Sequence, residues 1–419
     1  MIALYVKVVL FYAERRNLNV NIQKIIIIFL FLIISLGSIS YGYNMIEINE
    51  NSKSVDEENI IKDETMKEQQ ETFGIYSFLE NADQYTGEFF EGMDIQKILN
   101  SAIKGNVDNT NFYQRIINIL GGEVKTGIKS LISILAIIII HSILKSICDN
   151  LENETIGKLI YYVQYIAIVT VIMSNFSDII TMVKETSNNL VGFMNALIPI
   201  LISLMLYTGS ITTSGLLEPI ILFMIQFMGN LMENVLIPLL LIIVSLSIVS
   251  KIGDNIQVDK IAKFFKSGVI WFLGIILTIF VGIISLEGTM SSSIDGITAK
   301  TAKTIVSSAI PIVGKILGDA VDTVLGCGVV LKNALGLVGV IIVIGICIMP
   351  ILKLGVLTVC YKLLAGVCES ITDSKIISLL EQMADVFKVL LAILASLFVM
   401  VIIGTTLLIK MSNSGMMYR

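Results

Sequence analysis

The sequence predicts an all-α fold: a polytopic helical membrane protein with interrupted helices and a probable internal duplication, preceded by a signal peptide and a small acidic helical exocytoplasmic region. Composition is the first observation, because 55% of the residues are hydrophobic and 15% are charged, whereas soluble domains carry about 25% charged residues. The mean hydropathy of +0.85 agrees. Long apolar runs are the second observation, and the regular spacing of four of the five prolines is the third. Together they favour the membrane class.

Residues 1–40 predict an export signal. The apolar run Ile25–Ser40 follows basic residues, ends in small ones and is 16 residues long, shorter than the roughly 20 residues of a spanning helix. These features are typical of a secretory signal peptide, and an uncleaved signal anchor is the alternative. In either case the chain from residue 41 onward is expected outside the cytoplasm.

The next region is polar and acidic, with 16 acidic and 7 basic side chains in residues 41–125. We expect residues 41–72 to be an acidic flexible tether, because they have too little apolar surface to offset the entropy lost on ordering. From Phe73 onward apolar residues return at helical spacing, which predicts a small helical exocytoplasmic region over 73–126. This region is too short and too polar to enclose a catalytic cleft.

The membrane part begins at residue 127, with the first transmembrane helices in 127–188. Apolar spans are expected at about 127–147, 159–181, 190–208, 268–287, 334–359 and 389–410. The stretch 216–250 is too long for one ordinary helix and has a polar interruption at Gly229–Asn234, so we expect a hairpin or a re-entrant pair there. The loop 251–267 holds four lysines and two aspartates, which favours the cytoplasm. That side requires an even number of crossings between residues 209 and 251, which a hairpin provides.

The prolines indicate a duplicated unit. Pro199 and Pro238 are 39 residues apart, as are Pro311 and Pro350, and the two pairs are offset by 112. We therefore predict membrane repeat unit 1 at 189–287 and unit 2 at 301–410, an organisation common in transport folds. Coincidence in an Ile/Leu-rich sequence is the alternative, and whether the copies are parallel or inverted stays open. Helix breaks are expected at all five prolines: Pro199, Pro219, Pro238, Pro311 and Pro350.

Ionisable residues inside apolar spans are costly and by default suggest function. Asp178, Glu287 and His141 belong to this class. The residues that we single out for a pore or an interface are Glu218, Glu233, Lys315, Asp319, Asp322 and Lys332. For the two glutamates, a cap or loop position at the membrane interface is favoured over a polar cavity. The four charged residues of 311–333 recur at helical spacing and are the best candidate for a functional surface, with a solvated amphipathic connector as the alternative.

Catalytic chemistry is not indicated. The sequence contains no GxxxxGK[ST], HExxH, GxSxG or Gly-rich dinucleotide loop, and no basic aromatic patch for nucleic acid. His141 is the single histidine, and we expect it to bond a carbonyl of a neighbouring helix rather than relay protons. The five cysteines lie in or beside apolar sequence without a CxxC, which is typical of buried thiols. We expect no enzyme activity, no cofactor, no metal and no nucleic acid partner.

Three segments carry a family resemblance. They are NALIPILISLMLYTGS within residues 190–250, SSSIDGITAKTAKTIVSSAIPIVGKILGDAVDTVLGC at 291–327 and LLEQMADVFKVLLAIL at 379–394. Together they resemble the stage III sporulation protein AE family of endospore-forming bacteria, over about Phe73 to Lys410. The resemblance implies a permease-like multipass component of a channel complex between mother cell and forespore, in the mother-cell-derived outer membrane. It also implies partners: other products of the same sporulation operon and a forespore membrane protein. No catalytic residue is carried over.

Three functional hypotheses follow. The leading one is a channel-forming component of that complex, required for late forespore development. The alternative is an autonomous permease-like secondary transporter of an unknown small solute, with its site between the two units. A membrane-embedded enzyme is the least favoured, because nucleophile–base and metal constellations are missing. The lipid bilayer surrounds the protein in each case, and a homo-oligomer stays open.

Overall fold

A computed structural model describes residues 55–105, 110–149, 154–252, 258–309 and 313–412. The chain divides into two units, Met1–Glu58 and Asn59–Arg419, and apart from the first turn of α3 everything below concerns the second. The predicted signal peptide over 1–40 and the break at Pro311 lie outside the described residues. All regular elements in the described ranges are helices, in agreement with the predicted all-α class.

Residues 55–72 form a helix and not the second half of a flexible tether. The N-terminal elements are α3 (Val55–Thr72), α4 (Ile75–Thr86), the 3-10 helix η1 (Gly87–Phe90) and α5 (Ile95–Ile103). Near the end of α3, Gln69 is buried and its Nε2 donates a hydrogen bond to the Val324 carbonyl at 3.1 Å. A tertiary hydrogen bond to the Val324 carbonyl therefore holds the acidic helix α3, and the composition of α3 alone does not predict it. At the start of α5, the Asp94 side chain accepts hydrogen bonds from Gln96 N and Lys97 N and caps the helix.

Long helices make up the rest of the described chain. They are α6 (Thr110–Asp149), α7 (Glu154–Tyr207), α8 (Ile211–Leu231), the π-helical turn η2 (Met232–Leu236), α9 (Ile237–Val249), α10 (Asp259–Ala309), α11 (Val313–Cys368) and α12 (Ser374–Ser412). Six helical stretches among the described residues are long and apolar enough to cross a membrane: Gln114–Leu144, Ile156–Tyr207, Ile211–Val249, Asp259–Ser285, Thr323–Cys368 and Ser374–Lys410. They support the prediction of a polytopic membrane protein.

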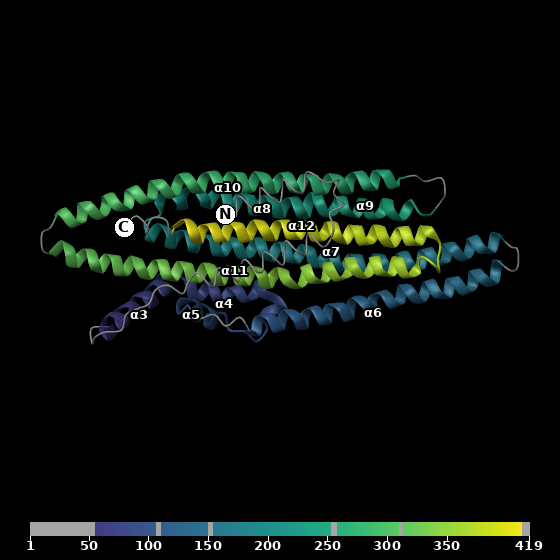
Figure 1. Ribbon diagram of the computed structural model, residues 1–419, viewed down its shortest axis with the longest axis horizontal. Coiled ribbons are helices and arrows are strands. Elements are labelled where there is room, and N and C mark those ends of the chain that lie inside the picture. Colours follow the sequence, from purple (N-terminus) through teal and green to yellow (C-terminus); the bar gives the residue numbers. More distant parts are fainter. Residues whose placement is uncertain (1–54, 106–109, 150–153, 253–257, 310–312, 413–419) are drawn as a thin grey trace. The chain divides into compact units, whose positions relative to one another are not determined.

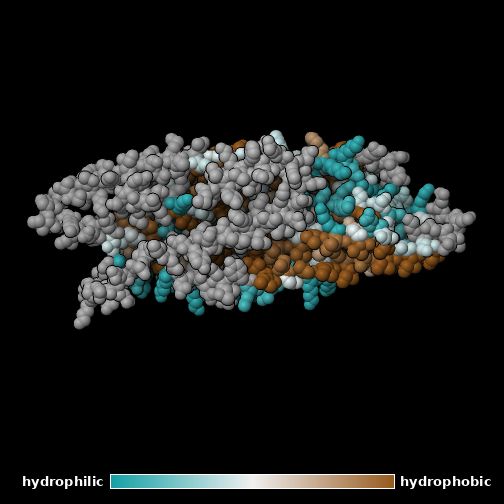
Figure 2. All heavy atoms as spheres, viewed as in Figure 1, coloured by the Kyte–Doolittle hydropathy of each residue, from teal (hydrophilic) through white to brown (hydrophobic). Residues whose placement is uncertain are grey.

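The pair α11–α12 forms the centre of the bundle (Figure 1). Helix α7 packs against both, α6 covers α7 and α11, and α10 packs against α8, α9 and α12. A buried aromatic cluster ties three helices together: the ring centroids of Phe387 and Tyr361 are 5.1 Å apart, and those of Phe387 and Phe176 are 6.2 Å apart. Hydrophobic side chains are gathered on the surface along α6 (Figure 2), where the exposed isoleucines include Ile128, Ile132, Ile139, Ile140 and Ile143.

Helix α7 replaces two of the predicted spans. The spans expected at 159–181 and 190–208 belong to one continuous helix of 54 residues. Residues 184–189 are polar but contain no glycine or proline, and they continue the helix. Pro199 lies inside the helix and removes only the backbone donor for the Asn195 carbonyl. The separation into two spans is therefore wrong.

The hairpin expected in 216–250 is also wrong. Helices α8 and α9 continue into each other through η2, and together they form one candidate span, Ile211–Val249. A π-helical turn inserts one extra residue into a helix without reversing its direction. Pro238 lies near the start of α9 and does not interrupt the continuous helix. The described residues between 114 and 249 therefore contain three candidate spans, where five crossings were expected.

The predicted duplication is not seen in the helix boundaries. Between Pro199 and Pro238 the chain turns at Gly209, which has a φ of 87°. At the offset of 112 the equivalent residue is Val321, in the interior of the continuous helix α11. A β-branched residue rarely adopts a positive φ, so the second unit has no turn where the first has one.

Candidate functional site

The residues singled out from the sequence do not form one cluster. Glu218 on α8 and Glu233 on η2 are half-buried, and 15 residues of helix, about 22 Å, separate them. The segment that holds Lys315, Asp319 and Asp322 is helical as part of α11, and these three side chains lie outside the described set. A role of these residues in a pore or an interface stays a prediction.

Lys332 faces the protein interior. Its side chain is fully buried, and its Nζ donates to the Ile409 carbonyl of α12 at 3.3 Å. Ile409 lies in the last turn of α12, where carbonyls lack intrahelical donors and the helix dipole favours a positive charge. The Lys332 amino group therefore acts as a cap that joins α11 to the end of α12.

A second set of charges fastens the opposite end of α12. Lys251 pairs with Asp259, whose Oδ1 also accepts a hydrogen bond from Gln382 Nε2 at 3.3 Å. Lys266 on α10 pairs with Asp385 on α12 at 2.5 Å. These contacts, here called the end cluster, connect α9, α10 and α12. Sequence reasoning missed them because the partners on α10 and α12 are more than 100 residues apart.

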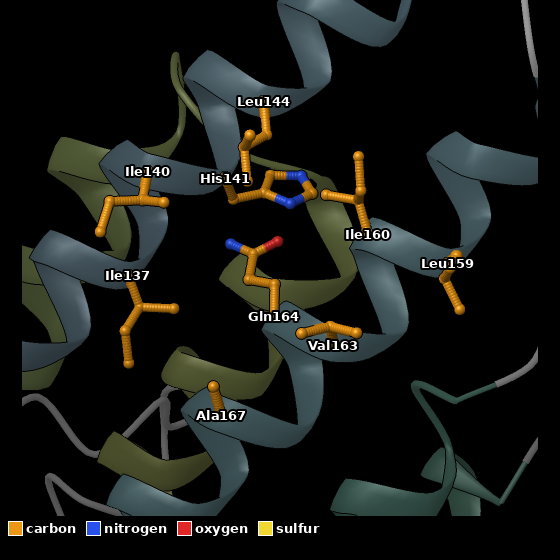
Figure 3. Close-up of a pocket in the computed structure, with 9 residues that line it drawn as sticks. All are labelled: Ile137, Ile140, His141, Leu144, Leu159, Ile160, Val163, Gln164 and Ala167. Atoms are coloured by element: carbon orange, nitrogen blue, oxygen red, sulfur yellow. The ribbon is translucent and has the colours of Figure 1, made fainter.

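A pocket of about 300 Å³ lies between α6 and α7 (Figure 3). Its apolar wall includes Ile140 and Val163, which are 58% and 63% exposed. Gln164 points toward His141 at its base (Figure 3), is 5% exposed, and neither of its amide atoms has a hydrogen-bond partner among the described residues. His141 Nε2 lies 3.6 Å from Asp373 Oδ2, a carboxylate rather than the carbonyl that we expected. The described residues contain no group of three or more potential metal ligands.

Helix α7 carries a polar stripe that we call the α7 polar face. Its members are exposed and recur mostly at intervals of three or four residues: Thr170, Ser174, Ser177, Asp178, Thr181, Glu185, Asn188, Asn195 and Ser203. Such spacing places side chains on one side of a helix. The same side is apolar closer to the N-terminus, at Ile156, Leu159, Val163 and Ile166. Of the α7 polar face, only Asp178 stood out in the sequence.

Polar residues of α8 and η2 extend the α7 polar face sideways. Gln226 Nε2 donates to Asn195 Oδ1 at 3.2 Å, and a Cβ built at Gly229 would meet Val191 Cγ2 at 2.7 Å. These two contacts set α7 and α8 in antiparallel register. Asn230 is exposed and Glu233 half-buried, and the register places both level with the middle of the α7 polar face.

Comparison with known proteins identifies relatives of the whole membrane part. The family model described as Stage III sporulation protein AE matches residues 93–412, which include all six candidate spans. The Stage III sporulation protein AE of Bacillus subtilis (strain 168) is 31% identical over 297 residues, covering 71% of this chain and 74% of the relative. No solved structure matches the chain.

Proposed function

Because the chain belongs to the stage III sporulation protein AE family, we propose that it is a multipass membrane component of a channel or secretion-like complex that connects mother cell and forespore. In this role it is required for late forespore development. The observation that carries the proposal is the α7 polar face on a candidate membrane span. A single copy surrounded by lipid would expose carboxylates and amides to hydrocarbon, whereas an assembly covers them.

The lysines support one orientation in the membrane. Eight of them lie near the loops 150–153, 253–257 and 369–373: Lys145, Lys158, Lys251, Lys260, Lys263, Lys266, Lys362 and Lys375. The other end of the passes has fewer, because the turn between α7 and α8 has no charged residue and Lys300, Lys303 and Lys315 flank residues 310–312. The positive-inside rule therefore favours a cytoplasmic position for the three lysine-flanked loops. The region before α6 and the C-terminus then lie outside the cytoplasm.

In the proposed complex the protein occupies the mother-cell-derived outer membrane around the forespore. Its exocytoplasmic region then faces the space between the two membranes. That side is where a forespore membrane protein and other products of the same operon are reachable as partners.

The test is genetic. Deleting the gene in its own sporulating host should leave engulfment normal and abolish late forespore gene expression. The intact gene placed elsewhere in the chromosome should restore both expression and spore yield. A normal yield of heat-resistant spores from the deletion strain would contradict the proposal.

A second candidate function, an autonomous secondary transporter, is favoured by one observation. Glu218 is a half-buried carboxylate inside the span Ile211–Val249, directly before Pro219, and a proline leaves a backbone carbonyl without its donor. The purified protein alone in liposomes should then take up a solute or protons, and Glu218→Gln should abolish that flux. Flux that is unchanged in the variant removes Glu218 from the mechanism.

A further inference from the structure

We propose that the α7 polar face, extended by Gln226 and Asn230, is the wall of a water-filled passage at bilayer depth, closed by further copies of this chain. The proposal deepens the proposed function and rests on it. From Thr170 to Ser203 the face extends for 33 residues of continuous helix, about 50 Å at 1.5 Å per residue. A hydrocarbon core is about 30 Å thick, so the face is long enough to cross it.

The depth of the face follows from the opposite side of the bundle. The Lys266–Asp385 pair and the Phe176–Phe387 contact set α10, α12 and α7 in parallel register. That register places Ile279 of α10 level with about residue 187 of α7. Ile279 is 51% exposed and Trp271, earlier on α10, is 70% exposed. The exposed Ile279 indicates a surface that faces hydrocarbon at its level, and an exposed Trp about 12 Å away along the helix is typical of the headgroup level.

Helix α8 marks the border between the two kinds of surface. Gln226 bonds to the α7 polar face, while Phe223 and Phe227 on the same helix are 64% and 41% exposed. At one level, therefore, the bundle exposes amides and carboxylates on the α7 side and large apolar side chains on the α8–α10 side. Water on the α7 side would solvate the amides and carboxylates, and lipid on the α8–α10 side would solvate the apolar side chains.

The chemistry of the face suits water and small hydrated cations. Its charged members, Asp178 and Glu185, are acidic, and Lys184 lies half-buried at its edge. Hydroxyl and amide groups supply the remaining polar contacts. Pro199 and Pro219 are exposed, and each leaves the carbonyl four residues earlier without its helical donor. Oxygen acceptors of this kind replace the hydration of cations in membrane passages.

One wall does not enclose water, so the passage needs further walls. Among the described N-terminal helices, α4 covers part of the face where Tyr85 packs on Gly192, between Asn188 and Asn195. The other members of the face are exposed among the described residues. Identical copies arranged around an axis would close the passage, because soluble and membrane oligomers of one chain commonly adopt closed rotational symmetry.

The experiment uses single cysteines in the full chain, in membranes of cells that produce it. Thr181→Cys and Asn188→Cys report on the α7 polar face, and Phe223→Cys and Ile279→Cys are matched controls on the apolar side. Four of the five native cysteines, Cys327, Cys347, Cys360 and Cys368, are buried, and the unsubstituted chain gives the background labelling of all five. A charged thiol reagent is excluded from hydrocarbon, as charged side chains are. Labelling should therefore be at least about tenfold faster at positions 181 and 188 than at 223 and 279.

Two results would overturn the proposal. Equally slow labelling at all four positions means that lipid or protein covers the face, and equally fast labelling means that this level lies outside the bilayer. A bifunctional thiol reagent should also link Thr181→Cys chains into oligomers, and purely monomeric chains would rule out closure by copies. These readouts do not depend on spore yield. A failed labelling pattern in a strain that still requires the gene would remove the passage and leave the sporulation role intact.

Discussion

Helices α7 and α11 have nearly the same length, 54 and 56 residues, and each contains a proline in its interior, yet they place their polar groups in opposite ways. Helix α7 exposes a row of hydroxyls, amides and carboxylates, whereas α11 buries Lys332 completely. In an apolar segment of 18 residues taken from each span, 50% of the segment is buried in α7 and 72% is buried in α11. The neighbours of a helix, and not the spacing of its charges, therefore decide which polar residues form an open surface.

The largest expected effect comes from reversing the charge inside α11. Lys332→Glu places a carboxylate next to the Ile409 carbonyl and should lower the free energy of unfolding by about 3–5 kcal/mol, the typical cost of an uncompensated buried charge. Lys332→Met keeps the volume without the charge and should cost much less. Unfolding of the purified variants in detergent, followed by circular dichroism, measures both. A Lys332→Glu protein as stable as the wild type would mean that Lys332 is not buried.

A smaller loss is expected from tightening the contact between α11 and η1. A Cβ at Gly345 would lie 2.9 Å from Phe89 Cδ1 and still closer to the Phe90 ring. Gly345→Ala should therefore destabilise the protein by about 1–3 kcal/mol through overpacking. Gly355→Ala on the same helix has nothing within 4 Å and should instead gain about 0.5–1 kcal/mol in helix propensity. Equal unfolding midpoints for the two variants would contradict this packing of η1 on α11.

The smallest effect on stability, with a change in function, is expected on α7. Glu185 is exposed, so Glu185→Lys should alter the free energy of unfolding by less than about 0.5 kcal/mol. If the α7 polar face lines the passage, the same change should lower the cation-to-anion permeability ratio of the protein in planar bilayers. Glu381→Lys is the control, because Glu381 is an exposed glutamate of α12 away from this face. An unchanged permeability ratio for Glu185→Lys would mean that Glu185 does not line the passage.

The sequence was sufficient for the helical membrane class but not for the number of spans. Mean hydropathy finds apolar runs, and it divided α7 at residues 182–189 because that segment is polar. Polarity does not end a helix when no glycine or proline is present, and Thr186 and Ser187 are buried against neighbouring helices. The turn at Gly209 had a recognisable signal, since glycine adopts a positive φ at little cost.

The candidate site was harder to predict for a related reason. Lys332 is paired with a carbonyl 77 residues away, and no local pattern shows such a partner. The α7 polar face did have a signal, a helical period of polar residues between Thr170 and Ser203. Averaging hydropathy along the chain hides this helical period, whereas comparing the hydropathy of opposite faces of the helix shows it.

The most direct test of a water-filled passage compares the surroundings of α7 and α10 at one level. Spin labels attached at Asn188→Cys and Ile279→Cys in reconstituted bilayers can be relaxed by oxygen, which concentrates in hydrocarbon, or by a water-soluble nickel chelate. We expect the nickel chelate to dominate at position 188 and oxygen to dominate at position 279. The same preference at both positions would contradict a water-filled passage along α7.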